Sequence, residues 1–255
     1  MNIGVLVIGH GSPDPHWTRM VEDTVRAAGL SYVTFVAFLE GNEQTSIAGG
    51  IDRLERQGVT DIVVVPLFIS SFTTHVNEIQ YALGIVEHPS FETDLAPIPH
   101  SAHIHFCEPM NDHRLISEIM VEKIDRQGFT ANRHGLILAA HGVNDEAIFR
   151  MYAKTMDRIV KQIGEGLGVS GVEYGTFYPA TLRHTVAHVG ELMEPFVVPY
   201  FLSEGHFTKK VIPAKLDGLR CDYRGIALLP HRNVALWIRE QVEAMATLVL
   251  QCSFY

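Results

Sequence analysis

The stretch of sequence that decides the fold is Val5-Leu6-Val7-Ile8-Gly9-His10-Gly11-Ser12. A run of aliphatic residues that ends at a glycine is typical of a strand buried on both faces. A histidine follows at the carboxyl end of this predicted strand, which is where open α/β sheets bind their ligands. The stretch therefore predicts a parallel sheet and a candidate functional residue, His10.

The same pattern returns 131 residues later, in Leu136-Ile137-Leu138-Ala139-Ala140-His141-Gly142. A second pair of histidines, His75 and His206, has the same separation, and both follow apolar runs, at 63–69 and 196–202. Self-similarity of this kind indicates that one half of the chain is a copy of the other. Each copy keeps two histidines in register.

Strands and helices are predicted to alternate along both halves, which implies βαβ units and parallel sheets. We expect an α/β fold of two similar four-stranded parallel-sheet domains, with helices on both faces and a pseudo-two-fold relation. The expected domains are residues 1–130 and 131–255, and 247–255 is assigned to no element. The predicted strands lie near 3–9, 32–39, 61–69, 103–107, 135–140, 171–178, 196–202 and 224–229. The predicted helices lie near 16–28, 45–57, 75–84, 112–127, 144–164, 180–193, 206–216 and 231–246.

Composition limits the class of protein. The 255 residues are 47% hydrophobic and 19% charged, which is enough for a sizeable core. A formal net charge of −9 argues against a nucleic-acid partner. The three scattered cysteines form no disulfide framework, and no apolar run is long enough to span a membrane. With no leader pattern at the N-terminus, we expect a cytoplasmic protein without membrane partners.

The histidines at the strand ends are the strongest candidates for chemistry. Two imidazoles at one edge of a sheet can bind a divalent metal or accept protons from a substrate, because the ordinary pKa of histidine, about 6.5, lies near working pH. A single histidine after a strand more often only caps the next helix. Two pairs at the same separation favour a functional role for His10, His75, His141 and His206.

Other polar residues near these histidines have weaker signals. Ser12 is a candidate for ligand binding, although capping of the first helix is the simpler interpretation. Glu78 lies three residues after His75 on the same predicted helical face, so it either orients the imidazole, binds metal or is merely solvated. His100, His103 and His105 form a cluster that is a metal-entry site or an unremarkable surface feature, since no carboxylate or cysteine completes a known ligand spacing.

Several common motifs are absent or misplaced. No GxxxxGK[ST] loop and no GxGxxG fingerprint occur in the sequence, so ATP hydrolysis and dinucleotide binding have no support. The triplet Arg133-His134-Gly135 is similar to the Arg-His-Gly of histidine phosphatases, but here it precedes a predicted strand instead of following one. This placement argues against a phosphatase.

Several motifs taken together identify a family. The first half contains Gly9-His10-Gly11-Ser12, Phe38-Leu39-Glu40, Val65-Pro66-Leu67-Phe68-Ile69 and His75-Val76-Asn77-Glu78, and the second contains Ala140-His141-Gly142 and Val198-Pro199-Tyr200-Phe201-Leu202-Ser203-Glu204-Gly205-His206. Nearly the whole chain, to about residue 246, resembles the sirohydrochlorin chelatases, which are ATP-independent class II tetrapyrrole chelatases. Two departures are the loop Ser70-Ser71-Phe72-Thr73-Thr74, which replaces a glycine-bearing loop, and Val143, which replaces a serine.

The resemblance implies a function and a set of site residues. It implies insertion of Co²⁺, Ni²⁺ or Fe²⁺ into sirohydrochlorin or a related tetrapyrrole, in cobalamin or siroheme biosynthesis. In this resemblance, the residues that bind the metal are His10, His75, His141 and His206. The residues that remove the pyrrole protons are His10, His75 or Glu78. A neutral imidazole is needed for both tasks, so activity should fall at acid pH. Tetrapyrrole carboxylates would meet local cations, for which Arg150, Arg183, Lys209 and Lys210 are candidates.

The resemblance also has implications for the cofactor and the oligomeric state. No cofactor is expected beyond the divalent metal substrate. Single-domain members of the family dimerise, so a fused duplication implies a monomer with an internal pseudo-dimer and a cleft between the halves. The alternative function is a metal-binding or delivery protein on the same fold, without insertion activity. The sequence leaves open which metal and tetrapyrrole are used and which histidine pair is active.

Overall fold

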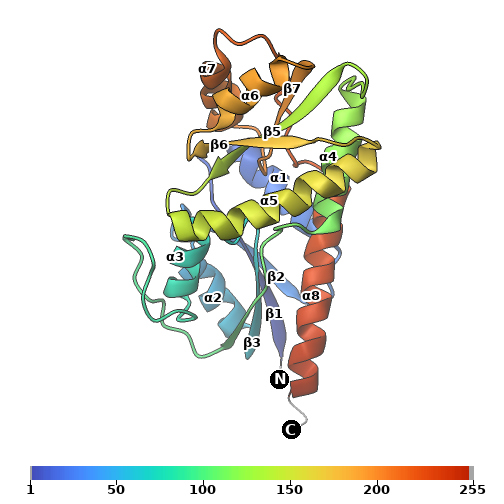
Figure 1. Cartoon of the computed structure of the whole chain (residues 1–255). Coiled ribbons are helices and arrows are strands. Elements are labelled where there is room, and N and C mark those ends of the chain that lie inside the picture. Colours follow the sequence, from blue (N-terminus) through green and yellow to red (C-terminus); the bar gives the residue numbers. More distant parts are fainter. Residues whose placement is uncertain (1, 253–255) are drawn as a thin grey trace. The chain divides into compact units, whose positions relative to one another are not determined.

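The computed structural model describes residues 2–252, and its strands and helices follow the predicted alternating order (Figure 1). The first half contains β1 (Ile3–Gly9), α1 (Pro15–Ala27), β2 (Val33–Phe38), α2 (Ile47–Arg56), β3 (Asp61–Pro66), α3 (Thr74–Ala82), β4 (His103–Phe106) and α4 (Arg114–Arg126). The second half contains β5 (His134–Gly142), α5 (Glu146–Leu167), β6 (Glu173–Tyr178), α6 (Leu182–Gly190), β7 (Glu194–Pro199), the π-helix η1 (Phe207–Val211), α7 (Ile212–Leu216), β8 (Asp222–Tyr223) and α8 (Arg232–Cys252).

The two sheets have the same topology. Their strand orders are β2-β1-β3-β4 and β6-β5-β7-β8, and every pairing is parallel. The strand that carries His10 at its end is central in one sheet, and the strand that carries His141 has the same place in the other. The expected α/β fold with two four-stranded parallel sheets is confirmed, and the matching orders agree with a duplicated unit.

The chain forms two compact units whose limits differ from a division at residue 130. One unit comprises residues 1–111 and 234–255, and the other comprises residues 112–233. Helix α4 therefore groups with the second sheet, and nearly all of α8 groups with the first. A sequence repeat shows where a copy begins, but it does not show against which sheet the last helix of that copy packs.

The first unit has apolar layers on both faces of its sheet. On one face, side chains of β1, β2 and β3 form a core cluster with α2 and α3; its fully buried strand residues are Leu6, Ile8, Ala37, Ile62 and Val64. The alternate strand positions, which point the opposite way, are equally buried. Nearly all of helix α8 belongs to this unit, and within it Arg239 Nε donates a hydrogen bond to the Ala28 carbonyl at 2.6 Å.

Helix caps explain part of the sequence repeat. The Asp14 carboxylate accepts the His16 amide at 2.9 Å and begins α1, while the Asp145 carboxylate accepts the Ile148 amide at 2.9 Å and begins α5. Each of these bonds satisfies a donor that the helix itself leaves unpaired. These aspartates share the 131-residue separation because both copies need the cap immediately after the histidine turn.

Three segments differ from the predicted elements. The strand expected near 224–229 does not form: the last strand of the sheet, β8, has only two residues and ends at Tyr223, and Ala227–Leu229 is a buried irregular segment. The helix expected over 206–216 begins as the π-helix η1 and continues as α7. Pro213, in the first turn of α7, has no N–H to donate to an ordinary α-helical hydrogen bond with the preceding turn. Helix α8 continues through residue 252, so most of 247–255 is helical, and residues 253–255 lie outside the described part.

Over residues 2–252, no helix has both the length and the apolar character that crossing a bilayer requires.

Candidate active site

The first two histidines lie at the point where the order of the strands reverses. His10 follows β1 directly, and His75 lies in the first turn of α3, the helix that follows β3. In a sheet of order β2-β1-β3-β4, the connections from β1 and β3 leave in opposite directions, which opens a crevice at the carboxyl ends of these strands. This position is the usual ligand site of doubly wound sheets.

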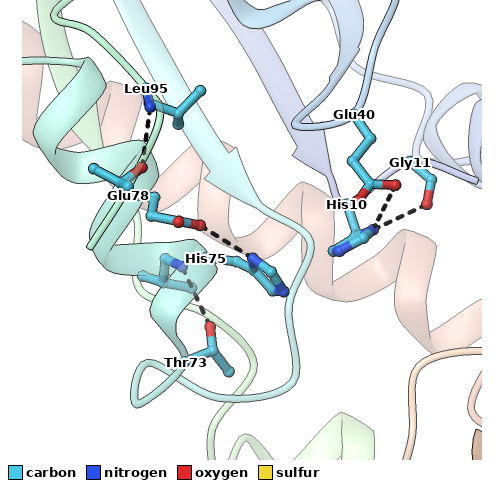
Figure 2. Close-up of polar contacts among 9 residues, drawn as sticks. His10, Gly11, Glu40, Thr73, His75, Glu78 and Leu95 are labelled. Carbon is cyan, nitrogen blue, oxygen red and sulfur yellow. Dashed lines mark hydrogen bonds and ion pairs between the residues drawn. The ribbon is translucent and has the colours of Figure 1, made fainter. Parts of the chain in front are cut away.

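The structure brings the two imidazoles together. The ring centroids of His10 and His75 lie 4.5 Å apart at an interplanar angle of 79°. Both side chains remain accessible, with exposed fractions of 38% and 40%. Figure 2 shows the two rings between the ends of their strands, each turned toward the other. Two imidazoles in this arrangement can share a metal ion after small side-chain rotations, because metal–nitrogen bonds are about 2.1 Å long.

The Nδ1 atom of each ring already has a partner, which leaves Nε2 for a ligand. His10 Nδ1 lies 3.1 Å from the Gly11 carbonyl oxygen and 3.8 Å from Glu40 Oε2. His75 Nδ1 lies 3.1 Å from Glu78 Oε2 (Figure 2). An Nδ1–H that donates to a carbonyl or carboxylate places the free lone pair on Nε2 and strengthens that nitrogen as a metal ligand or base.

The loop before α3 is held by side-chain hydrogen bonds. The Thr73 hydroxyl accepts the Val76 amide at 3.2 Å and fixes the start of α3, which places His75 and Glu78 one turn apart on one face. Upstream, the Ser71 amide donates to Asn111 Oδ1 at 2.9 Å, and Asn111 Nδ2 donates back to Ser71 Oγ at 2.8 Å. These bonds hold the loop that replaces a glycine-bearing one.

Glu40 is a site residue to which the sequence reasoning assigned no role. The Glu40 amide donates to the His10 carbonyl at 2.8 Å, which extends the β1–β2 ladder beyond both strands and sets the carboxylate beside the imidazole. Gly11 permits this approach, because its φ is +101° and a Cβ there would lie 3.2 Å from Glu40 Cβ. The available signal was the position of Glu40 two residues past the strand that neighbours β1.

The second histidine pair has different surroundings. Ring centroids place His141 at 5.3 Å from Tyr178 and 5.3 Å from Phe207, and Phe207 also contacts His206 at 5.9 Å. In the part of the chain that the structure describes, no ring contact or hydrogen bond joins His141 to His206. Phe207 contacts both histidines of the second copy, whereas His10 and His75 contact each other directly.

Both carboxylates of the first site are replaced in the second copy. Strand register pairs Gly142 with Tyr178, so Tyr178 occupies the place that Glu40 has beside Gly11. The 131-residue separation matches Glu78 with Lys209, which reverses the charge. A cation and a phenol do not offer a dipositive metal the support that two carboxylates give.

The remaining candidates for ligand binding already have partners. Ser12 Oγ accepts the Asp14 amide at 3.1 Å, as a residue of the capping turn does. Arg150 pairs with Glu146 at 2.5 Å, and Lys209 pairs with Glu204 at 3.3 Å. Arg183 donates to the Lys215 and Asp217 carbonyls at 2.6 and 2.9 Å, and Lys210 is exposed.

The cluster around His105 lies at the opposite end of its sheet. His105 on β4 contacts Asp61, the first residue of β3, at 3.1 Å, and His100 contacts backbone carbonyls. Burial would raise the pKa of Asp61, but hydrogen bonds with Thr60 and His105 outweigh it and hold that pKa below its usual range. Asp61 is therefore an anion that stabilises the strand edge around His105.

Two further features carry no evident chemistry. His134 is buried at the start of β5, where its Nδ1 accepts the Thr130 amide at 2.9 Å, so the Arg-His-Gly triplet is structural. All three cysteines are free, and burial raises the pKa of the Cys107 thiol to about 12, so it is a poor metal ligand. Across residues 2–252, no three or more His, Cys, Asp and Glu side chains are arranged to hold a metal ion together.

Two proteins of known name are similar to this chain in sequence. Methanococcoides burtonii has a sirohydrochlorin cobaltochelatase that is 26% identical over 124 residues, which are 93% of that protein and 48% of this chain. A probable sirohydrochlorin cobaltochelatase of Halobacterium salinarum is 28% identical over 232 residues, 75% of its length and 82% of this chain. The shorter relative matches about half of this chain, as a duplication requires.

Solved structures share the fold. SirB from Bacillus subtilis with Fe³⁺ has a TM-score of 0.73 at 18% identity, with 96% of each chain covered. A CbiX structure described as the terminal enzyme of siroheme biosynthesis in denitrifying bacteria has a TM-score of 0.61 at 20% identity, covering 94% of this chain and 98% of the other. The CbiX family model matches residues 4–127 and again residues 135–244. Because these two matches together span most of the chain, the chain belongs to the CbiX family.

Proposed function

We propose that this protein inserts a divalent first-row metal ion into sirohydrochlorin or a closely related tetrapyrrole, without ATP. The observation that carries the proposal is the contact between His10 and His75 at the switch point of the first sheet, with each Nδ1 engaged and each Nε2 available. Family membership and the names of the relatives support the class of reaction. The reaction needs no cofactor beyond the metal that it transfers.

The proposed reaction releases two protons for each metal inserted, because two pyrrole N–H groups are replaced by metal–nitrogen bonds. The metal first binds the Nε2 atoms of His10 and His75 in their neutral form. As the metal moves to the pyrrole nitrogens, the freed imidazoles become able to accept protons. Glu40 and Glu78 stabilise the resulting imidazolium ions, since each carboxylate lies beside an Nδ1 atom.

Most of the cations proposed to bind the tetrapyrrole carboxylates would first have to leave the protein groups that they contact now. Arg150 and Lys209 form exposed ion pairs, which contribute little stability and open readily. Arg183 would have to give up hydrogen bonds to two carbonyls, so it is a weaker candidate than the exposed Lys210.

The names of the relatives favour cobalt as the first metal to test.

An absorbance assay tests the proposal. Purified protein is mixed with sirohydrochlorin and Co²⁺, Ni²⁺ or Fe²⁺ under anaerobic conditions, and the rate of metallation is compared with the rate without protein. A chelatase accelerates the spectral change with turnover above one metal per protein. A delivery protein, the alternative function, binds the metal in a titration but does not accelerate insertion.

Glu78→Gln is expected to slow insertion by about 10- to 100-fold, because the substitution removes the anion that orients His75 and stabilises its protonated form. The matched control is Glu87→Gln, which makes the same change at an exposed carboxylate of the same unit. Steady-state rates of both variants measure the effect. Equal rates for Glu78→Gln and the unaltered protein would show that Glu78 is only a solvated helix residue.

A further inference from the structure

Helix α6 carries two histidines that belong to neither of the pairs described above. His184 and His188 lie one turn apart on its exposed side, while the side that faces the second sheet is formed by Leu182, Val186 and Val189. Their ring centroids are 6.5 Å apart, and the rings are nearly parallel, at 12°. Neither ring has a role in the packing of the unit.

This spacing is the one at which a helix chelates a transition metal. Residues at i and i+4 project from the same face, and two histidines placed so bind one metal ion in the helical HExxH motif. Imidazole suits Co²⁺, Ni²⁺, Cu²⁺ and Zn²⁺. Because both rings are exposed, rotation of the side chains is enough to direct two nitrogens at one ion without a backbone change.

The charges around the pair favour a cation. His188 lies in the last turn of α6, where the carbonyl end of the helix dipole attracts positive charge. Glu191 follows three residues later on the same face and adds a negative charge. The neighbouring cation, Arg183, is already engaged, because it donates hydrogen bonds to the Lys215 and Asp217 carbonyls.

We propose that His184 and His188 form a second, exposed site for one divalent first-row metal ion, with water completing the coordination. The site is separate from His10 and His75 and does not depend on the insertion activity proposed above. It would hold a metal ion on the protein in the absence of any tetrapyrrole.

Calorimetric titration of the metal-free protein with Ni²⁺ alone tests the proposal. The variant His184→Gln/His188→Gln is expected to lose about one bound Ni²⁺, while binding at His10 and His75 persists. Each single variant, His184→Gln or His188→Gln, should weaken this second event by about tenfold or more, because both rings must bind together. The matched control is His88→Gln, which removes an exposed histidine without an i+4 partner.

Two results would overturn the proposal. One is a double variant whose Ni²⁺ titration equals that of the His88→Gln control. The other is a loss produced by only one of the two single variants, since a chelate requires both rings. A protein altered at His10 and His75 should keep the second event, so failure of the proposed insertion activity and failure of this site give different results.

Discussion

His10→Ala is expected to lower the rate of metal insertion by at least ~100-fold, whereas His141→Ala leaves the rate nearly unchanged. The two residues occupy equivalent places at the carboxyl ends of β1 and β5, the corresponding interior strands of their sheets. Only His10 has a second imidazole in ring contact and a carboxylate beside its Nδ1 atom. His141 instead contacts aromatic rings. Steady-state metallation of sirohydrochlorin with Co²⁺, corrected for the uncatalysed background, measures both variants.

The second member of each pair provides the control for this comparison. His75→Ala should act like His10→Ala, and His206→Ala should act like His141→Ala. All four side chains are at least partly exposed, so thermal melts should change little and lost activity should not reflect lost folding. Loss of activity in the second pair alone would invert the assignment. Unchanged rates in all four variants would remove the histidines from the mechanism.

Much of the fold follows from local patterns in the sequence. Fully buried parallel strands are continuous apolar runs, so β1 and β3 could be placed closely from residues such as Val5 and Val63. The carboxyl ends of adjacent parallel strands meet at one edge, and this rule accounts for the contact between His10 and His75. The constant separation between the copies then gave the matching order of the second sheet.

Other features depend on contacts between distant residues, which the sequence does not reveal. The copies keep all four histidines, yet Tyr178 and Lys209 stand where the first copy has Glu40 and Glu78. The importance of these replacements becomes visible only once the strand register shows which side chains lie beside each imidazole. The packing of α4 and α8 was likewise unpredictable, because an amphipathic helix can cover the apolar face of either similar sheet.

Gly142→Ala is expected to reduce the free energy of unfolding of the protein by about 3 kcal/mol. Gly142 has a φ of +76°, which disfavours any side chain, and a Cβ there would overlap the Tyr178 carbonyl oxygen and lie 2.8 Å from Thr176 Cβ. These neighbours belong to β6, which pairs with β5 along its length, so they have little freedom to move. Urea denaturation followed by circular dichroism measures the loss.

The matched control separates strain of the backbone from the steric clash. Gly168→Ala, in the same unit, has a similar φ of +68° but no atom within 4 Å of the added Cβ, so its cost should be about 1 kcal/mol. Equal losses for the two variants would show that the clash is relieved by movement of β6. A larger loss at Gly142 would mean that the glycine after the histidine is required by the close approach of the next strand, a constraint that Gly11 shares beside Glu40. Gly142 would then be needed in the second copy for packing alone, whether or not His141 contacts a second histidine.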